Sequence, residues 1–128
     1  MTYFVTWRLA RGQVELDPNE RDLVAQALKH FHGQRYHLAA YVIMDDHVHT
    51  IVTPLGSIRL KDILHSWKSF TAHRMRLKRP DRVWQDEYFD RIVRDDKEFI
   101  EKLRYILGNP WKRWPELDVY LWLWPTQQ

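Results

Sequence analysis

Two kinds of hydrophobic pattern alternate along this chain. Four stretches are rich in aromatic and β-branched residues and are bounded by turn residues, which is typical of β-strands. These predicted strands cover residues 3–10, 35–43, 47–53 and 83–94, with an interruption in the last of them. Three other stretches place apolar residues at helical spacing and predict helices over residues 18–32, 58–78 and 96–107.

Residues with capping ability mark the ends of the predicted helices. Asp17 and Glu20 fit a capping box at the start of the first helix. Ser57 and Asp95 are predicted to cap the second and third helices, because short polar side chains can accept a hydrogen bond from the free N–H groups there. The segment Gly108-Asn109-Pro110 is expected to end the third helix.

The order β-α-β-β-α-β, followed by a further helix, predicts a ferredoxin-like α+β fold. In this fold helices cover one face of an antiparallel sheet, and the first and third strands are neighbours at its centre. The chain has 128 residues, without an internal repeat or a linker. We therefore expect a single domain over residues 1–128, with residues 111–128 as a C-terminal flank or lid packed on it.

The third predicted strand carries a pair of histidines. His47 and His49 are two residues apart, so their side chains emerge on the same face of the strand. Two neighbouring imidazoles can bind several divalent metals. The alternative is a strand that carries two histidines and no metal. A position in a central strand favours a metal site, because a rigid sheet can hold the ligands in place.

The third predicted helix carries a second candidate group. Tyr105 and Asn109 are four residues apart and share a helix face that lies away from the apolar stripe. A tyrosine hydroxyl can act as a nucleophile, and an amide carbonyl can bind a metal. The alternative is a tyrosine that packs its ring and exposes its hydroxyl. Tyr88 is a second candidate nucleophile, although no metal-binding residue stands near it at a suitable spacing.

Charge and aromatic content point to a partner that carries phosphate. The net charge is +3 and the isoelectric point about 9.3. Seven Trp, six Tyr and five Phe exceed the needs of a core of this size, so some are available to stack on bases. Candidate phosphate contacts are Lys61, Lys68, Arg74, Arg76, Lys112 and Arg113, and candidate stacking residues are Trp111 and Trp114. The alternatives are ordinary solvated lysines and indoles buried on the domain.

Several protein classes are excluded by what the sequence lacks. Without cysteine, the chain has neither disulfides nor thiolate metal sites. No apolar run approaches the roughly 20 residues of a membrane span, and the N-terminus does not resemble a signal peptide. We expect a soluble cytoplasmic protein with no membrane partner. With four Gly, the chain shows no glycine-rich loop that would cradle a nucleotide phosphate.

Three motifs together carry a resemblance to a known family. The segment from Tyr41 to His49 resembles the histidine-hydrophobic-histidine motif of the single-tyrosine transposases, which are HUH-type and IS200-like. The segments Trp84-Gln85 and Tyr88 to Arg94, then Leu103 to Pro110, resemble the REP-associated tyrosine transposases, a branch of that family. The resemblance extends from Tyr3 to about Trp124, with the motifs in the family's order.

The resemblance implies a metal-dependent endonuclease and strand transferase that cleaves single-stranded DNA beside a hairpin. Tyr105 would be the nucleophile that forms a 5′-phosphotyrosine, and His47 and His49 would bind Mg²⁺ or Mn²⁺. Asn109 stands where related transposases carry Gln, which keeps the carbonyl on a shorter arm, and Asp46 stands where many relatives carry Asn. The implied partner is single-stranded or hairpin DNA, bound by a monomer or a homodimer.

Two other functions remain open at this level. The chain can be a domesticated nucleic-acid-binding protein that uses the same basic and aromatic surface without catalysis. It can also be a metal-dependent phosphodiester hydrolase that uses water, with Tyr105 as a bystander. A covalent protein–DNA adduct distinguishes these alternatives from a transposase, because a water nucleophile leaves none.

Overall fold

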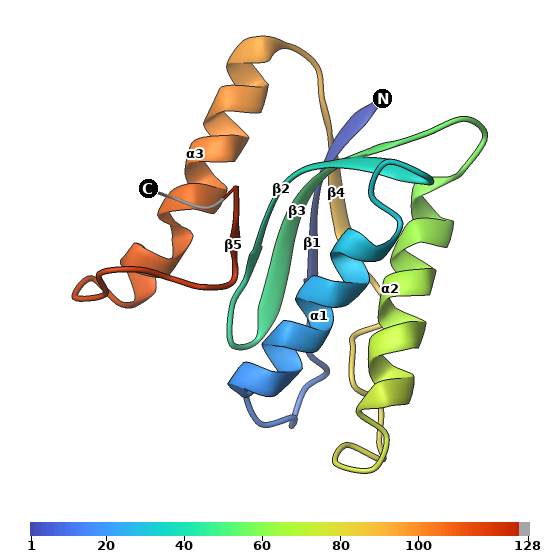
Figure 1. Ribbon diagram of the computed structural model, residues 1–128, viewed down its shortest axis with the longest axis vertical. Helices are drawn as coiled ribbons and strands as arrows, with labels where there is room; N and C mark the ends of the chain where they lie inside the picture. The colour runs from blue at the N-terminus through green and yellow to red at the C-terminus, as the bar shows by residue number, and fades with distance from the viewer. Residues whose placement is uncertain (126–128) are drawn as a thin grey trace.

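The computed structural model describes residues 1–125 as a five-stranded antiparallel sheet with helices on both faces (Figure 1). The strand order is β4-β1-β3-β2-β5. The strands are β1 (Thr2–Arg8), β2 (Tyr36–Ile43), β3 (His47–Pro54), β4 (Phe89–Val93) and β5 (Leu123–Trp124). The helices are α1 (Pro18–His30), α2 (Leu60–Arg74) and α3 (Asp96–Arg113). The ferredoxin-like prediction is confirmed, including β1 and β3 as central neighbours.

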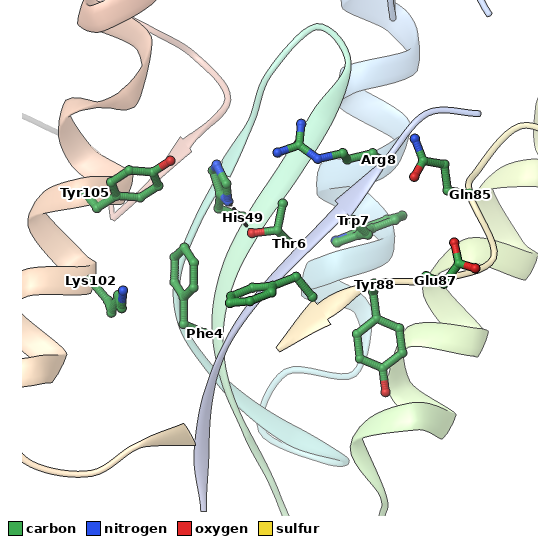
Figure 2. Close-up of a pocket in the computed structure, with 11 residues that line it drawn as sticks. Phe4, Thr6, Trp7, Arg8, His49, Gln85, Glu87, Tyr88, Lys102 and Tyr105 are labelled. Atoms are coloured by element: carbon green, nitrogen blue, oxygen red, sulfur yellow. Dashed lines mark hydrogen bonds between the residues drawn. The ribbon is translucent and has the colours of Figure 1, made fainter. Parts of the chain in front are cut away.

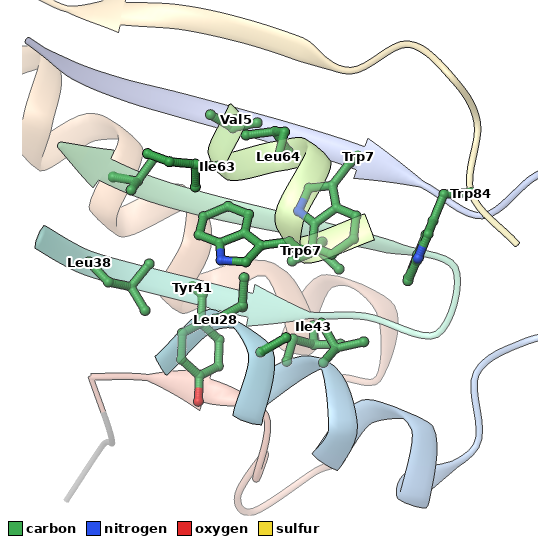
Figure 3. Packing of buried hydrophobic residues seen from close by; sticks show 14 of the residues in the cluster. Val5, Trp7, Leu28, Leu38, Tyr41, Ile43, Ile63, Leu64, Trp67 and Trp84 are labelled. Atoms are coloured by element: carbon green, nitrogen blue, oxygen red, sulfur yellow. The ribbon is translucent and has the colours of Figure 1, made fainter. Parts of the chain in front are cut away.

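Helices α1 and α2 cover one face of the sheet, where the larger core lies (Figure 3). Trp7 of β1 packs against Trp67 of α2 and against Trp84, with ring centroids 6.1 and 4.6 Å apart. The indole N–H of Trp67 donates to the Tyr36 hydroxyl at 3.0 Å, so this buried polar group is satisfied. The larger core therefore joins the sheet to both helices through large aromatic side chains.

Helix α3 lies on the opposite face, over a smaller core. Ile106 is fully buried there and packs with Phe4 of β1, Val42 of β2 and Ile51 of β3. These strand residues alternate with those of the larger core, as the two-residue period of a strand requires. The helix contacts β2, β3 and β5.

The helix ends were only partly predicted. The capping box of Asp17 and Glu20 and the Asp95 cap are present. Ser57 does not cap α2: it lies in a turn, and the helix begins at Leu60 without a side-chain cap. The expected end near residue 78 is also wrong, because α2 stops at Arg74. The chain then turns so that Arg79 can reach the buried carboxylate of Glu20.

Helix α3 does not end at the Gly108-Asn109-Pro110 segment but continues to Arg113. Proline lacks the N–H that would donate to the carbonyl four residues earlier, so one helical hydrogen bond is lost. Asn109 and Pro110 are buried, and this packing offsets the loss. The helix ends when the Trp114 N–H donates to the Pro110 carbonyl at 2.7 Å.

The segment after α3 folds back along the edge of the sheet. Tyr120 donates its hydroxyl to the Ile43 carbonyl at 2.6 Å, and β5 then pairs with β2. The indole N–H of Trp122 donates to Asp22 of α1 at 2.8 Å. Within residues 1–125, no helix combines the length and apolar character needed to cross a membrane.

Candidate active site

The two histidines of β3 lie side by side on the sheet face that carries α3. The ring centroids of His47 and His49 are 4.7 Å apart. The register pairs His49 with Thr6 of β1, and Thr6 Oγ1 shares a hydrogen bond of 2.7 Å with His49 Nδ1. The ring of Phe4 stacks on His49 at 5.4 Å. The strand therefore fixes both the position and the ring plane of His49.

The Nε2 atom of His49 is buried and has no hydrogen-bond partner among the described residues. Burial, together with the nearby His47 and Arg8, lowers the pKa of His49 to about 3. The imidazole is therefore neutral at physiological pH. With Nδ1–H donated to Thr6, Nε2 keeps a free lone pair, as a metal ligand requires.

His47 is oriented by the residue that precedes it. Its Nδ1 lies 2.6 Å from Asp46 Oδ1, and a carboxylate can only accept, so Nδ1 carries the proton. Burial raises the pKa of Asp46, but the His47 hydrogen bond and nearby positive charges outweigh burial and lower it. A carboxylate that orients a histidine through Nδ1–H is a common arrangement behind metal ligands.

Tyr105 of α3 meets this pair of histidines. Its ring lies edge-on to His49, with centroids 5.2 Å apart, and edge-on to Phe4 at 5.8 Å. It is 41% exposed, so the side chain is open to a substrate on one side. The sequence placed Tyr105 off the apolar stripe of its helix, and in the structure it stands at the margin of the core under α3. Lys112 places its Nζ 4.8 Å from the Tyr105 ring centroid.

His49 and Tyr105 line one end of a groove of about 650 Å³ (Figure 2). The groove extends across β1 toward the segment that leads into β4. Figure 2 shows the Tyr105 hydroxyl directed toward His49, whereas the Tyr88 hydroxyl points away from it. The other lining residues are Phe4, Thr6, Trp7, Arg8, Gln85, Glu87, Tyr88, Phe89 and Lys102. The groove is large enough to admit part of an extended polymer.

The donor atoms fit a divalent metal only as an open site. Within residues 1–125, no cluster of three or more His, Cys, Asp or Glu side chains could hold a metal ion. The structure brings the two imidazoles together, whereas the carbonyl oxygen of Asn109 as a third ligand stays a prediction. Asn109 is 8% exposed and lies one helical turn after Tyr105. The unpartnered Nε2 of His49 favours such a site, with the remaining positions left to phosphate and water.

The basic residues of α2 lie on the other side of the sheet from His49. Lys68 is half-buried and donates to the carbonyls of Gln85, Asp86 and Glu87 at 2.8, 3.1 and 3.4 Å. Lys68 therefore stabilises the segment from Gln85 to Glu87, which lies at the other end of the groove from His49. Three other candidates are exposed, and their contact with phosphate stays a prediction: Lys61, Arg74 and Arg76.

The candidates at the end of α3 differ in their surroundings. Lys112 lies beside Tyr105, as described above. Arg113 Nη2 donates to Asp45 Oδ2 at 2.6 Å, which places it in an ion pair. The indole N–H of Trp111 donates to the Leu117 carbonyl at 2.7 Å, and the Trp114 ring stacks on Tyr120 at 5.5 Å. Both indoles are half-buried against the C-terminal segment.

Sequence reasoning missed part of the site. Phe4, Thr6 and Arg8 belong to it because they alternate along β1 and face α3, but their partner residues depend on the strand register. Lys102 lines the groove with its Nζ 5.0 Å from the Phe4 ring centroid. Its spacing of three residues from Tyr105 was a signal that could have identified it.

Comparisons with known proteins identify the family and support the fold. The family model described as Transposase IS200 like matches residues 3–109. A solved REP-associated tyrosine transposase bound to a REP hairpin is similar with a TM-score of 0.74 and 24% identity, covering 88% of this chain and 67% of that one. A candidate transposase from Deinococcus radiodurans R1 is similar with a TM-score of 0.57 and 21% identity, covering 84% of this chain and 89% of that one.

A comparison with curated proteins finds no significant match. The family model spans both histidines of β3, Tyr105 and Asn109. Because it matches most of the chain, the assignment does not depend on the short motifs alone. This chain belongs to the IS200-like transposase family, and its function is transposase-like DNA processing.

Proposed function

We propose that this protein is a REP-associated tyrosine transposase: a metal-dependent endonuclease and strand transferase for single-stranded DNA at hairpins. The observation that carries the proposal is the meeting of Tyr105 with His49. The tyrosine ring and an unpartnered imidazole Nε2 stand at one end of an open groove. A structural histidine in a core would have this nitrogen satisfied.

Tyr105 is the proposed nucleophile in strand cleavage. The Tyr105 oxygen attacks the phosphorus, the bond to the 3′ oxygen breaks, and this oxygen leaves as a 3′-OH after taking a proton. The phenol proton is released, and the 5′-phosphate stays on Tyr105. Because the tyrosyl ester conserves a phosphodiester bond, the 3′-OH of a DNA strand can reverse the step and join itself to the phosphate.

His47, His49 and Asn109 would hold the metal. A divalent cation there, Mg²⁺ or Mn²⁺, would neutralise charge on the phosphate and orient it. Hydrogen bonds with Asp46 and Thr6 at the Nδ1 atoms fix the two rings and leave their Nε2 atoms available to the metal.

Single-stranded or hairpin DNA is the proposed substrate. The solved relative with the same fold is bound to a REP hairpin, and the surface near Tyr105 carries lysines. Tyr105 and His49 meet within one chain, which supports a complete site in each protomer. A monomer would then be sufficient for cleavage.

Trapping of the covalent intermediate tests this function. The substrate is a DNA hairpin with a single-stranded 5′ flank, taken from repeated palindromes beside the gene and incubated with Mn²⁺. Mass spectrometry should find the nucleotide on the peptide that carries Tyr105. Tyr105→Phe should abolish both adduct and cleavage, while its free energy of unfolding changes by about 1 kcal/mol or less, since at most one ordinary hydrogen bond can be lost.

Tyr88→Phe is the matched control and should behave as the wild type. Three results separate the candidate functions. An adduct on Tyr105 supports the transposase. Cleavage without an adduct would indicate a hydrolase that uses water. DNA binding without cleavage would indicate a domesticated binding protein.

A further inference from the structure

Two lysines and the candidate nucleophile share one flank of helix α3. Lys102, Tyr105, Asn109 and Lys112 follow one another at spacings of three, four and three residues. Such spacings align side chains along one side of a helix. Tyr105 therefore stands between two cationic side chains on the flank that borders the groove.

Contacts in the structure hold both ammonium groups near this tyrosine. Lys112 Nζ lies 4.8 Å from the Tyr105 ring centroid, and Lys102 Nζ lies 5.0 Å from the centroid of Phe4, which itself touches Tyr105. Helical side chains lean toward the N-terminus, so Lys112 leans back over Tyr105. Cations over aromatic faces are held without being neutralised.

Neither lysine has an acidic partner within residues 1–125, where other cations of the chain do. On α3 itself, Arg113 is paired with Asp45, and Glu98 at the start of the helix is paired with Arg91. Two positive charges without counter-charges beside a nucleophile match a substrate that brings its own negative charges. A DNA backbone has this property.

We infer that Lys102 and Lys112 form a phosphate clamp on either side of the nucleophile. Lys112 contacts a non-bridging oxygen of the phosphate that Tyr105 attacks, and Lys102 contacts a phosphate further along the strand, inside the groove. Ten residues separate the two lysines, about 15 Å along the helix axis, so the strand runs along α3. The inference rests on the proposed function of Tyr105 and adds the path of the strand across it.

The two lysines should differ in their effects. A phosphate contact that is made equally before and during reaction contributes to binding, whereas one that strengthens in the transition state contributes to rate. Lys102 should contribute to binding, because it lies in the groove. Lys112 should contribute to both binding and rate, because it lies at the ring of the nucleophile.

Neutral variants test the clamp. Lys102→Gln and Lys112→Gln keep the side-chain stems, and Lys97→Gln is the control because Lys97 is an exposed α3 lysine off this flank. Binding of the oligonucleotide dT20 is measured in EDTA over a range of salt. Each clamp variant should reduce the slope of log affinity against log salt by about 0.7, as expected for one contact to single-stranded DNA. The Lys97 variant should keep the wild-type slope.

Adduct formation on the hairpin DNA with Mn²⁺, at saturating DNA, separates the two roles. Lys112→Gln should slow it on the order of 100-fold, as for the loss of one donor to a developing charge. The control Lys97→Gln should keep the wild-type rate, and Lys102→Gln should slow adduct formation less than Lys112→Gln does. The clamp would be overturned if the salt slopes of Lys102→Gln and Lys112→Gln equalled that of Lys97→Gln. An unchanged adduct rate in Lys112→Gln would show that Lys112 does not contact the attacked phosphate. If the wild type forms no adduct while the slopes fall as expected, the clamp stands and the proposed cleavage fails.

Discussion

Replacing Arg113 by glutamine distinguishes the role that the sequence suggested from the one that the structure gives. The sequence offered Arg113 as a phosphate contact. In the structure its guanidinium lies 2.6 Å from Asp45 Oδ2, while Glu15 is more distant at 3.8 Å. The Asp45 side chain is only 4% exposed, and its Oδ1 has no partner within residues 1–125. This carboxylate therefore depends on Arg113.

The expected loss of stability follows from leaving a buried carboxylate without its cation. Removing one partner of a buried ion pair costs about 3–5 kcal/mol. Burial already raises the pKa of Asp45, even with Arg113 opposing it, so the carboxyl can take up a proton and limit the cost. Arg113 is also 41% exposed, which lets water reach the pair. We therefore expect a loss of about 3 kcal/mol, at the lower limit of that range.

Thermal unfolding measures this effect, with Arg104→Gln as the control because Arg104 is an exposed α3 arginine outside the ion pairs. For a chain of this size, 3 kcal/mol corresponds to a Tm decrease on the order of 10 °C. Asp45→Asn in the Arg113→Gln background should recover most of it, because the unpaired charge is gone. A Tm equal to that of the wild type, together with weaker salt-dependent DNA binding, would refute the ion-pair argument and favour the phosphate contact.

Two further predictions concern the metal and the buried ion pair at the end of α2. His49→Ala should abolish both adduct formation and Mn²⁺ binding, which calorimetry measures. Asn109→Ala should weaken both less, because water can replace one carbonyl ligand. An unchanged Mn²⁺ affinity in His49→Ala would contradict the proposed metal site. Arg79 is 3% exposed and bidentate to Glu20, so Arg79→Met should cost about 3–5 kcal/mol in denaturant unfolding, with exposed Arg76→Met near zero. Burial raises the pKa of Glu20, but the Arg79 hydrogen bonds outweigh burial and lower the pKa. The stabilisation by this ion pair is therefore complete above about pH 4.5 and is lost as the pH falls below it. A difference in unfolding free energy between wild type and Arg79→Met that stays constant over pH 3–6 would contradict this.

The elements that the sequence predicted correctly depend on neighbouring residues in the chain. The capping box of Asp17 and Glu20 forms within four residues, and the two-residue period of β3 places His47 and His49 on one face. The β-α-β-β-α-β order then places β3 at the centre of the sheet. Each of these steps uses local periodicity or a simple topological rule, and each is confirmed.

The misassigned boundaries depend on contacts between distant segments. Local propensity predicts that the Gly108-Asn109-Pro110 segment ends α3, but burial of this turn extends the helix to Arg113. The environments of Lys68 and Arg113 also depend on distant segments. The Lys68 ammonium binds a carbonyl 17 residues further on, and the partner of Arg113 is 68 residues away. A helical wheel shows these cations as solvent-facing, because it contains no information about the segment that folds over them.

The fold and the candidate site depend on a single strand register, that of β1 against β3. Slipping β1 by one residue would exchange the residues on its two faces, moving Val5 and Trp7 out of the larger core. Slipping it by two would keep the faces but place Phe4 or Arg8 opposite His49, which would remove the Thr6 partner of Nδ1. The first slip is prevented by the hydrophobic core on one face, and the second by the stacking of large rings around Trp7. The packing under α1 and α2 therefore fixes, through the sheet, the orientation of the imidazole that faces Tyr105.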